Sequence, residues 1–124
     1  MQPSSMKDRK ALVIGGGQGI GRATALELAQ AGSAVAVLDT EGDRAETVAG
    51  EIREQGGESV SIVADVTSSA GAEEGLDRAW SEWGGLDSVV NIVGSSSWGT
   101  LLELDEESWE RDFSINFCLL YTSP

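Results

Sequence analysis

The sequence predicts an α/β fold, a doubly wound parallel sheet with helices on both faces, of which about four to five strands are present. Short apolar runs alternate with segments of helical periodicity, and the connections between them are short and rich in glycine or polar residues. Strands separated in this way by helices require right-handed parallel crossovers. The carboxyl ends of such strands meet at one edge of the sheet, which is where ligands bind.

The first strand is expected over residues 11–14, and a turn rich in glycine follows it directly over residues 15–21. A helix is expected next, over residues 22–31. Glycines permit positive φ values and carry no Cβ atom that would keep a phosphate away, and the N–H groups at a helix N-terminus attract an anion. This order of strand, turn and helix favours a dinucleotide pyrophosphate site of Rossmann type over a merely flexible loop.

The second strand is expected over residues 34–38 and ends at Asp39. A carboxylate at this position can accept hydrogen bonds from the adenosine ribose hydroxyls and repels a 2′-phosphate, which favours NAD over NADP. Gln18, inside the glycine turn, supports NAD because a Lys or Arg there would suit the phosphorylated cofactor. The alternative is that Asp39 forms a turn or a helix cap before Gly42.

The second helix is expected over residues 43–55, before a pair of glycines that ends it. Its apolar residues recur at the spacing of one helix face: Ala45, Val48, Ala49 and Ile52. The third strand is expected over residues 60–64. Asp65 follows this strand directly, so a second carboxylate is expected at the carboxyl edge of the sheet.

The third helix is expected to begin at a serine cap, either Ser68 or Ser69, because a serine hydroxyl can accept from a first-turn N–H group. Its apolar stripe consists of Ala72, Leu76, Ala79, Trp80 and Trp83. At this spacing the two tryptophans are expected to pack on the sheet as core residues, rather than to stack on a ring ligand.

The fourth strand is expected over residues 86–93, whose nearly continuous apolar character is typical of a parallel strand buried on both faces. A loop over residues 94–100 separates this strand from one more helix. In that helix Asp105 is expected to be the N-cap, with Leu104 and Trp109 forming a hydrophobic staple around it.

Length and composition bound the organisation of the chain. Its 124 residues fit one domain over residues 10–117, after an expected disordered leader over 1–9 and before an atypical tail over 118–124. No apolar run is long enough for a membrane span, and the N-terminus lacks the apolar region of a signal peptide. Together with the single cysteine, Cys118, these features predict a cytoplasmic protein.

The chain is strongly acidic, with a formal net charge of −13. This surplus of acids makes nucleic acid and anionic membranes unfavourable partners. The acids either keep exposed helix faces solvated, which we favour, or form a face for a cationic partner. The chain has no histidine, which excludes Ser-His-Asp and Cys-His nucleophile systems, and we expect no metal site.

The glycine turn and several later motifs resemble those of the short-chain dehydrogenase/reductase family over nearly the whole chain. Residues 14–21 are similar to the family's TGxxxGIG pattern, with Ile14 in place of the usual Thr. The pair Asp65-Val66 resembles the family's Asp-Val pair, which contacts the adenine ring. Residues 83–87 resemble the family's FGxLD segment before the fourth strand.

Two further matches concern the fourth strand and the last helix. Residues 91–94 match the family's NNAG motif only at Asn91 and Gly94, and Ile92 departs from it. Asn116 is similar to the helix Asn of the family's catalytic tetrad, so the resemblance makes it the catalytic position. The cofactor-binding positions that the resemblance and the motifs imply are Gly15, Gly17, Gln18, Gly19, Ile20, Gly21, Asp39, Asp65, Val66, Asn91 and Gly94.

The resemblance implies an NAD(H)-dependent oxidoreductase that interconverts a small secondary alcohol and a ketone, and a homo-oligomeric full-length form. The family's chemistry also needs a Ser and a Tyr-x-x-x-Lys beyond the helix Asn. Tyr121 has no Lys four residues on, and no Lys follows Lys10. The chain is therefore expected to be an N-terminal fragment that is inactive on its own.

Two other functions are compatible with parts of this pattern. A non-catalytic module would bind NAD without turnover. An S-adenosylmethionine methyltransferase also uses a glycine turn and an acid after the second strand. The close spacing of Gly19-Ile20-Gly21 and the pair Asp65-Val66 favour the dinucleotide over that second alternative.

Overall fold

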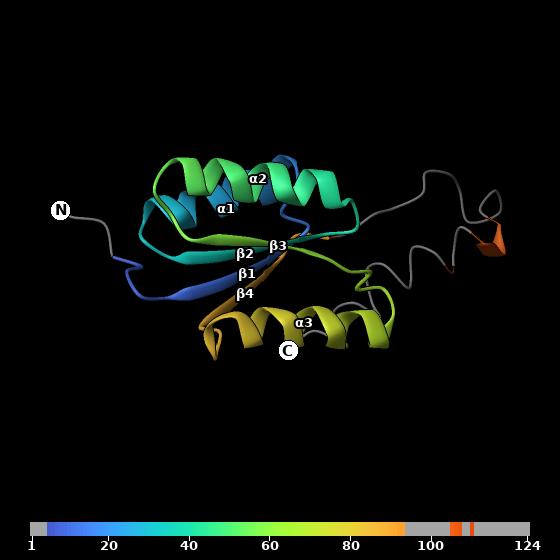
Figure 1. Ribbon diagram of the computed structural model, residues 1–124. Helices are drawn as coiled ribbons and strands as arrows, with labels where there is room; N and C mark the ends of the chain where they lie inside the picture. The colour runs from blue at the N-terminus through green and yellow to red at the C-terminus, as the bar shows by residue number, and fades with distance from the viewer. Residues whose placement is uncertain (1–4, 94–104, 108–109, 111–124) are drawn as a thin grey trace.

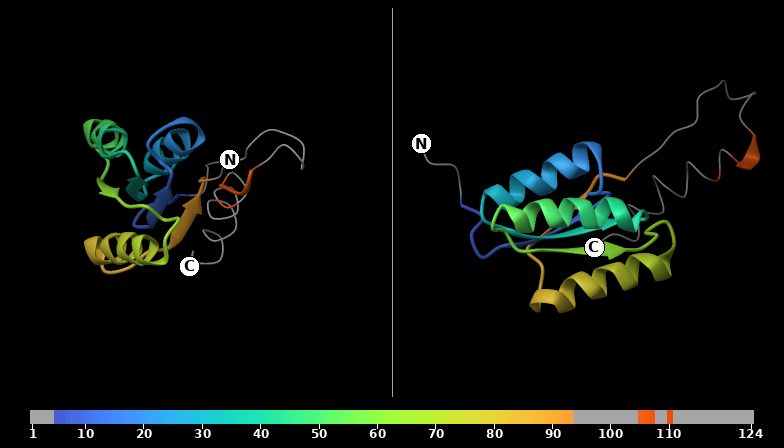
Figure 2. Two further views of the ribbon diagram at one scale, coloured as in Figure 1. Left: turned by 90° about the vertical axis from the view of Figure 1, so that its right-hand side faces the viewer. Right: turned by 45° about the horizontal axis from the view of Figure 1, so that its top comes forward.

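The computed structural model describes residues 5–93, 105–107 and 110, and in this part of the chain four parallel strands form one sheet in the order β3-β2-β1-β4. Helices α1 and α2 cover one face of the sheet, and α3 covers the other (Figure 1). The turned views in Figure 2 show the same three layers. The predicted α/β fold with a doubly wound parallel sheet is confirmed.

The elements follow the order expected from the sequence. The strands are β1 (Lys10–Ile14), β2 (Ala34–Asp39), β3 (Ser59–Val63) and β4 (Ser88–Asn91), and the helices are α1 (Gly19–Gln30), α2 (Gly42–Glu54) and α3 (Ser69–Trp83). The largest difference in the helices concerns α1, which begins inside the glycine turn rather than at residue 22. Its first turn is closed by the N–H of Arg22, which donates to the carbonyl of Gln18 (3.1 Å).

The sheet register brings the carboxyl ends of the strands level with one another. Ile14, at the end of β1, is paired with Leu38 on one side and with Asn91 on the other. Asp39 in turn pairs with Val63 at the end of β3. The residues that follow each strand therefore emerge at the same edge, as the parallel crossovers predict.

Alternate strand residues face two separate cores, because side chains point to opposite faces along a strand. Leu12 and Ile14 belong to the core beneath α3, together with Leu38. Val13 belongs to the core beneath α1 and α2, which also contains the predicted face of α2: Ala45, Val48, Ala49 and Ile52. The helix face predicted from the spacing of these four residues is thus confirmed.

The fourth strand is shorter and less buried than the sequence predicts. It covers Ser88–Asn91 rather than residues 86–93, and all its residues are half-buried. In the described sheet β4 lies at an edge and pairs only with β1, so one of its sides has no strand beside it. Val89 packs against the core beneath α3 and Val90 against the core beneath α1 and α2, so β4 contacts a core on both faces as predicted, but it is only half-buried.

The prediction for the tryptophans of α3 is correct for one of them and wrong for the other. Trp83 packs partly against the core beneath α3, and its Nε1 donates to Oε2 of Glu58 (3.0 Å). Trp80 is 57% exposed. The buried residues of α3 are the small Ala72, Gly75 and Ala79. Because a helix turns by about 100° per residue, Trp80, one position beyond the buried Ala79, lies at the border of the face that packs on the sheet.

The two ends of the chain are described only in part. Residues 1–4 of the expected leader lie outside the described residues, whereas Met6 donates its backbone N–H to the carbonyl of Ala31 (2.8 Å). Residues 106–107, directly after Asp105, are helical, in agreement with the predicted start of a helix there. Trp109 and the expected tail over residues 118–124 lie outside the described part. No helix among the described residues is long and apolar enough to cross a bilayer.

Candidate functional site

A cavity of about 530 Å³ lies at the carboxyl edge of the sheet. Most of the cofactor-binding positions predicted from the sequence line it: Gly15, Gln18, Gly19, Ile20, Asp39, Asp65 and Val66. Gly17, Gly21 and Asn91 are not among its lining residues but hold the surrounding backbone in place, as described below. Gly94 and the predicted catalytic Asn116 lie outside the described residues.

The glycine turn depends on close backbone contact between its two ends. A Cβ atom built on Gly21 would lie 1.9 Å from the carbonyl oxygen of Gly15, a distance that no real side chain tolerates. At the start of the turn, the N–H groups of Gly15 and Gly16 both donate to the carbonyl of Leu38 (2.8 and 3.1 Å). The turn is therefore folded back on itself and fixed against the end of β2.

The N-terminus of α1 opens onto this cavity. Gln18 is the N-cap residue, its side chain makes no capping hydrogen bond, and the first turn of α1 contains no acidic residue. By contrast, the N-terminus of α3 is capped by Ser68, whose hydroxyl accepts from the N–H of Gly71 (3.0 Å). The first-turn N–H groups of α1 are thus without a side-chain cap, which suits a bound anion.

Asp39 forms the turn that the sequence offered as an alternative, and it also lies at the cavity where a ribose is expected. Its side chain lines the cavity and the residue is only 8% exposed. Oδ1 accepts from the N–H of Glu41 (3.0 Å), which is the bond of a turn former, and Oδ2 accepts from the N–H of Gly17 (3.0 Å). Because each carboxylate oxygen can accept more than one hydrogen bond, both keep capacity for a ribose hydroxyl.

Asp65 and Asn91 are held by bonds within their own turns. Oδ1 of Asp65 accepts from both the backbone N–H (3.0 Å) and the hydroxyl of Thr67 (2.5 Å). These bonds, that from the hydroxyl first, lower the pKa of Asp65 below its ordinary value, against a smaller opposing effect of burial. Oδ1 of Asn91 accepts from the N–H of Val93 (3.1 Å), so this side chain shapes the backbone that leaves β4.

Sequence reasoning missed several residues that line the cavity. They are Leu38, Thr40, Arg44, Ala64, Thr67, Ile92 and Val93. Thr40 follows β2 directly, and Thr67 lies four residues after the end of β3, in the turn that Asp65 begins. Residues just beyond parallel strands face the same edge of the sheet, so the place of these two threonines in the chain is the signal for them. Arg44 lies in the first turn of α2, and only the packing of that helix beside the glycine turn brings it to the cavity.

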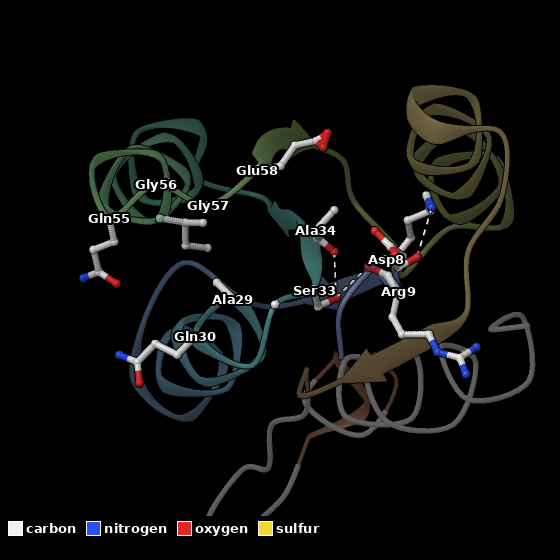
Figure 3. Close-up of a pocket in the computed structure, with 13 residues that line it drawn as sticks. Asp8, Arg9, Ala29, Gln30, Ser33, Ala34, Gln55, Gly56, Gly57 and Glu58 are labelled. Atoms are coloured by element: carbon white, nitrogen blue, oxygen red, sulfur yellow. Dashed lines mark hydrogen bonds between the residues drawn. The ribbon is translucent and has the colours of Figure 1, made fainter. Parts of the chain in front are cut away.

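A second cavity of similar size, about 560 Å³, lies at the opposite edge of the sheet. Figure 3 shows it between the ends of α1 and α2, with Gln30, Ser33 and Gln55 among the residues around it. The hydroxyl of Ser33 is used within the protein, where it donates to the carbonyl groups of Arg9 and Ala34 (3.1 and 3.0 Å). None of the cofactor-binding positions predicted from the sequence lines this cavity.

Comparison with known proteins agrees with this geometry. The sequence profile of the short chain dehydrogenase family matches residues 9–121. The chain is 33% identical over 116 residues to 2,3-dihydro-2,3-dihydroxybenzoate dehydrogenase of Bacillus subtilis, and this match covers 94% of the chain and 44% of the relative. It is 37% identical over 117 residues to elsinochrome reductase 1 of Elsinoe fawcettii, with the same two coverages of 94% and 44%.

Solved structures show the same similarity. A short-chain dehydrogenase/reductase from Serratia marcescens superposes with a TM-score of 0.92 at 32% identity, over 97% of this chain and 49% of that one. A 7α-hydroxysteroid dehydrogenase, solved in complex with NADH and 7-oxo glycochenodeoxycholic acid, superposes with a TM-score of 0.90 at 28% identity, over 95% and 46%. The chain spans about half the length of these relatives. It belongs to the short-chain dehydrogenase/reductase family of oxidoreductases, which decides against the methyltransferase alternative.

Proposed function

We propose that this chain binds NAD at the carboxyl edge of its sheet, as the cofactor-binding part of an oxidoreductase that interconverts a small secondary alcohol and a ketone. The observation that carries the proposal is the meeting of three features in one cavity: the glycine turn, the uncapped N-terminus of α1 and the carboxylate of Asp39. When bound, NAD would supply the hydride acceptor or donor of the reaction.

Each part of the dinucleotide has a matching group in the cavity. The pyrophosphate suits the first-turn N–H groups of α1, because that end carries a partial positive charge and no acidic side chain. The adenosine ribose suits Asp39, and the adenine ring suits the turn formed by Asp65 and Val66. The nicotinamide would then lie toward Ile92 and Val93, where the chain leaves β4.

The preference for NAD over NADP rests on the charge of Asp39. A carboxylate that is only 8% exposed would repel a phosphate group on the neighbouring ribose. Gln18 contributes no positive charge in the turn. The neighbouring 7α-hydroxysteroid dehydrogenase was solved with NADH, which supports the same class of cofactor for this chain. A cytoplasmic location and a homo-oligomeric full-length protein remain part of the proposal, from the single cysteine and the family resemblance respectively.

The proposal is tested by titrating the 124-residue chain with NADH and with NADPH under calorimetric detection, at one ionic strength. We expect NADH to bind at least about fivefold more tightly, since placing a second anion beside a carboxylate costs on the order of 1 kcal/mol or more. Equal affinities would overturn the assignment of NAD. Failure of both ligands to bind the folded chain would overturn the site itself.

A further inference from the structure

We propose that Asp39 has a second task in this site: it positions the glycine turn so that the turn can receive a pyrophosphate. This inference rests on the proposed function and extends it. The two roles of Asp39, binding the ribose and positioning the turn, have different consequences for ligand binding. A carboxylate that acts only on the ribose has no effect on a ligand without ribose hydroxyls. A carboxylate that shapes the turn affects every ligand that places phosphates there.

The hydrogen bonds of Asp39 join two loops that belong to different strands. Oδ2 accepts from the N–H of Gly17, in the loop after β1, and Oδ1 accepts from the N–H of Glu41, in the loop after β2. Both donor–acceptor distances are 3.0 Å. The bond to Gly17 is buried. Hydrogen bonds to an ionised acceptor are stronger than neutral ones, and more so away from water.

Gly17 has no room for a side chain, because Asp39 and Arg44 occupy the space where its Cβ would lie. A Cβ atom built on Gly17 would lie 2.5 Å from Oδ2 of Asp39 and 2.7 Å from Cβ of Arg44. The turn therefore rests directly against the carboxylate and the first turn of α2. Gly17 is required here because of this close approach, which is a reason separate from access of the phosphate to the backbone.

The same bond decides which N–H groups remain for a phosphate. The N–H groups of Gly15 and Gly16 donate to Leu38, and that of Gly17 donates to Asp39, so three consecutive groups are directed toward β2. The groups that follow, at the start of α1, are the ones left to face the cavity. Asp39 supplies the last of these three anchors and thereby sets where the start of α1 lies.

The test compares ADP with 2′,3′-dideoxy-ADP, which has the same diphosphate but no ribose hydroxyls, in calorimetric titrations of the 124-residue chain. The variant is Asp39→Asn, whose amide offers only one acceptor oxygen to the two N–H groups. The matched control is Glu41→Gln, which removes an equal charge in the same loop and leaves the hydrogen bonds of Asp39 in place. Removing a negative charge alone favours a diphosphate, so this effect opposes the expected loss.

We expect Asp39→Asn to weaken binding of 2′,3′-dideoxy-ADP by about fivefold, the loss of one hydrogen bond in the turn, and Glu41→Gln to change it by less than about twofold. If Asp39→Asn weakens ADP but leaves dideoxy-ADP unchanged, the positioning role is overturned while the proposed function stands. If neither ligand binds the unmodified chain, the proposed function is overturned and the inference with it.

A second measurement separates positioning from a general loss of stability. We expect amide hydrogen exchange in Asp39→Asn to accelerate at Gly17, with exchange at Val37 in the buried part of β2 unchanged. Gly17→Ala should weaken dideoxy-ADP binding at least as much, because its Cβ would also meet Cβ of Arg44. The double variant should lose clearly less than the sum of the two single losses, because both changes break the contact between Gly17 and Asp39. Unchanged exchange at Gly17, or additive losses, would contradict the inference.

Discussion

The two edges of the sheet carry cavities of nearly the same volume, about 530 and 560 Å³, but very different chemistry. At the carboxyl edge, α1 begins without a side-chain cap, and the carboxylate of Asp39 lies beside the glycine turn. At the amino edge, α1 and α2 end instead of beginning, so their dipoles present partial negative charge. Volume alone does not distinguish the edges, whereas the direction of the helices does.

The largest effect is expected from Gly21→Ala, which should disrupt the glycine turn at the carboxyl edge and leave the cavity at the amino edge unchanged. The added Cβ would meet the carbonyl oxygen of Gly15 at 1.9 Å, so the turn must open or α1 must move. We expect a loss of about 2 kcal/mol in the free energy of unfolding and at least about tenfold weaker NADH binding. Chemical denaturation and NADH titration measure the two quantities.

The control for that variant is Gly50→Ala, on α2, where an added Cβ would have no heavy atom within 4 Å. Alanine is the better helix former, so this change should raise the free energy of unfolding by about 0.5–1 kcal/mol and leave NADH binding unaltered. If the two alanines weakened NADH binding equally, the effect would not belong to the carboxyl edge.

A smaller effect is expected from Arg44→Gln, which tests how much the charge of Arg44 contributes to ligand binding at the carboxyl edge. Arg44 lines the cavity with Asp39, and its positive charge partly offsets the repulsion of a 2′-phosphate. We expect NADPH binding to weaken by about threefold and NADH binding to stay within about twofold, as suits an exposed charge. Arg53→Gln is the matched control, because Arg53 lies on the same helix but pairs with Glu46 (2.5 Å) away from the cavity.

Gln55→Ala changes the amino edge of the sheet and should leave ligand binding at the carboxyl edge unaltered. This residue is exposed and lines the second cavity near the end of α2, and Figure 3 shows its side chain pointing away from the ribbon. We expect the free energy of unfolding to change by less than about 0.5 kcal/mol and the NADH affinity by less than about twofold. A tenfold loss of NADH affinity would reverse the comparison and place the ligand at the amino edge.

The smallest effect concerns the pH dependence of Asp65. Its pKa is lowered in the folded chain, chiefly by the hydroxyl of Thr67, so its contribution to stability is present above the unfolded pKa and is lost as the pH falls through the folded one. Thr67→Val should therefore cost a few tenths of a kcal/mol at neutral pH, since Asp65 is exposed and solvent screens it, and nothing at pH values below the folded pKa. Denaturation curves across acidic pH measure this difference.

Much of the carboxyl edge could be predicted from local sequence. Apolar runs mark where strands end, so the positions of Asp39 and Asp65 at one edge follow from the order of the elements. The sequence predicts one of two serines as the N-cap of α3, and Ser68 is the one whose hydroxyl accepts from a first-turn N–H group, that of Gly71. These features depend on neighbours within a few residues, which is the range that patterns and caps describe.

What could not be predicted depends on packing between elements distant in sequence. The bond from Gly17 to Asp39 exists because the sheet register sets the end of β1 beside the end of β2, and no local pattern contains that distance. The exposure of Trp80 depends in the same way on which face of α3 packs on the sheet, and that face is formed by Ala72, Gly75 and Ala79. In both cases contacts between elements distant in sequence decide the outcome, and the local sequence pattern does not contain them.

The most direct test of the account is to map the NADH site by backbone amide chemical shifts of the 124-residue chain. If NADH binds at the carboxyl edge, the largest shift changes will lie in the glycine turn, at the start of α1 and at Thr40 beyond β2, with none at Ser33, Gly56 or Gly57 around the amino edge. Changes concentrated at the amino edge, with the glycine turn unaffected, would contradict it.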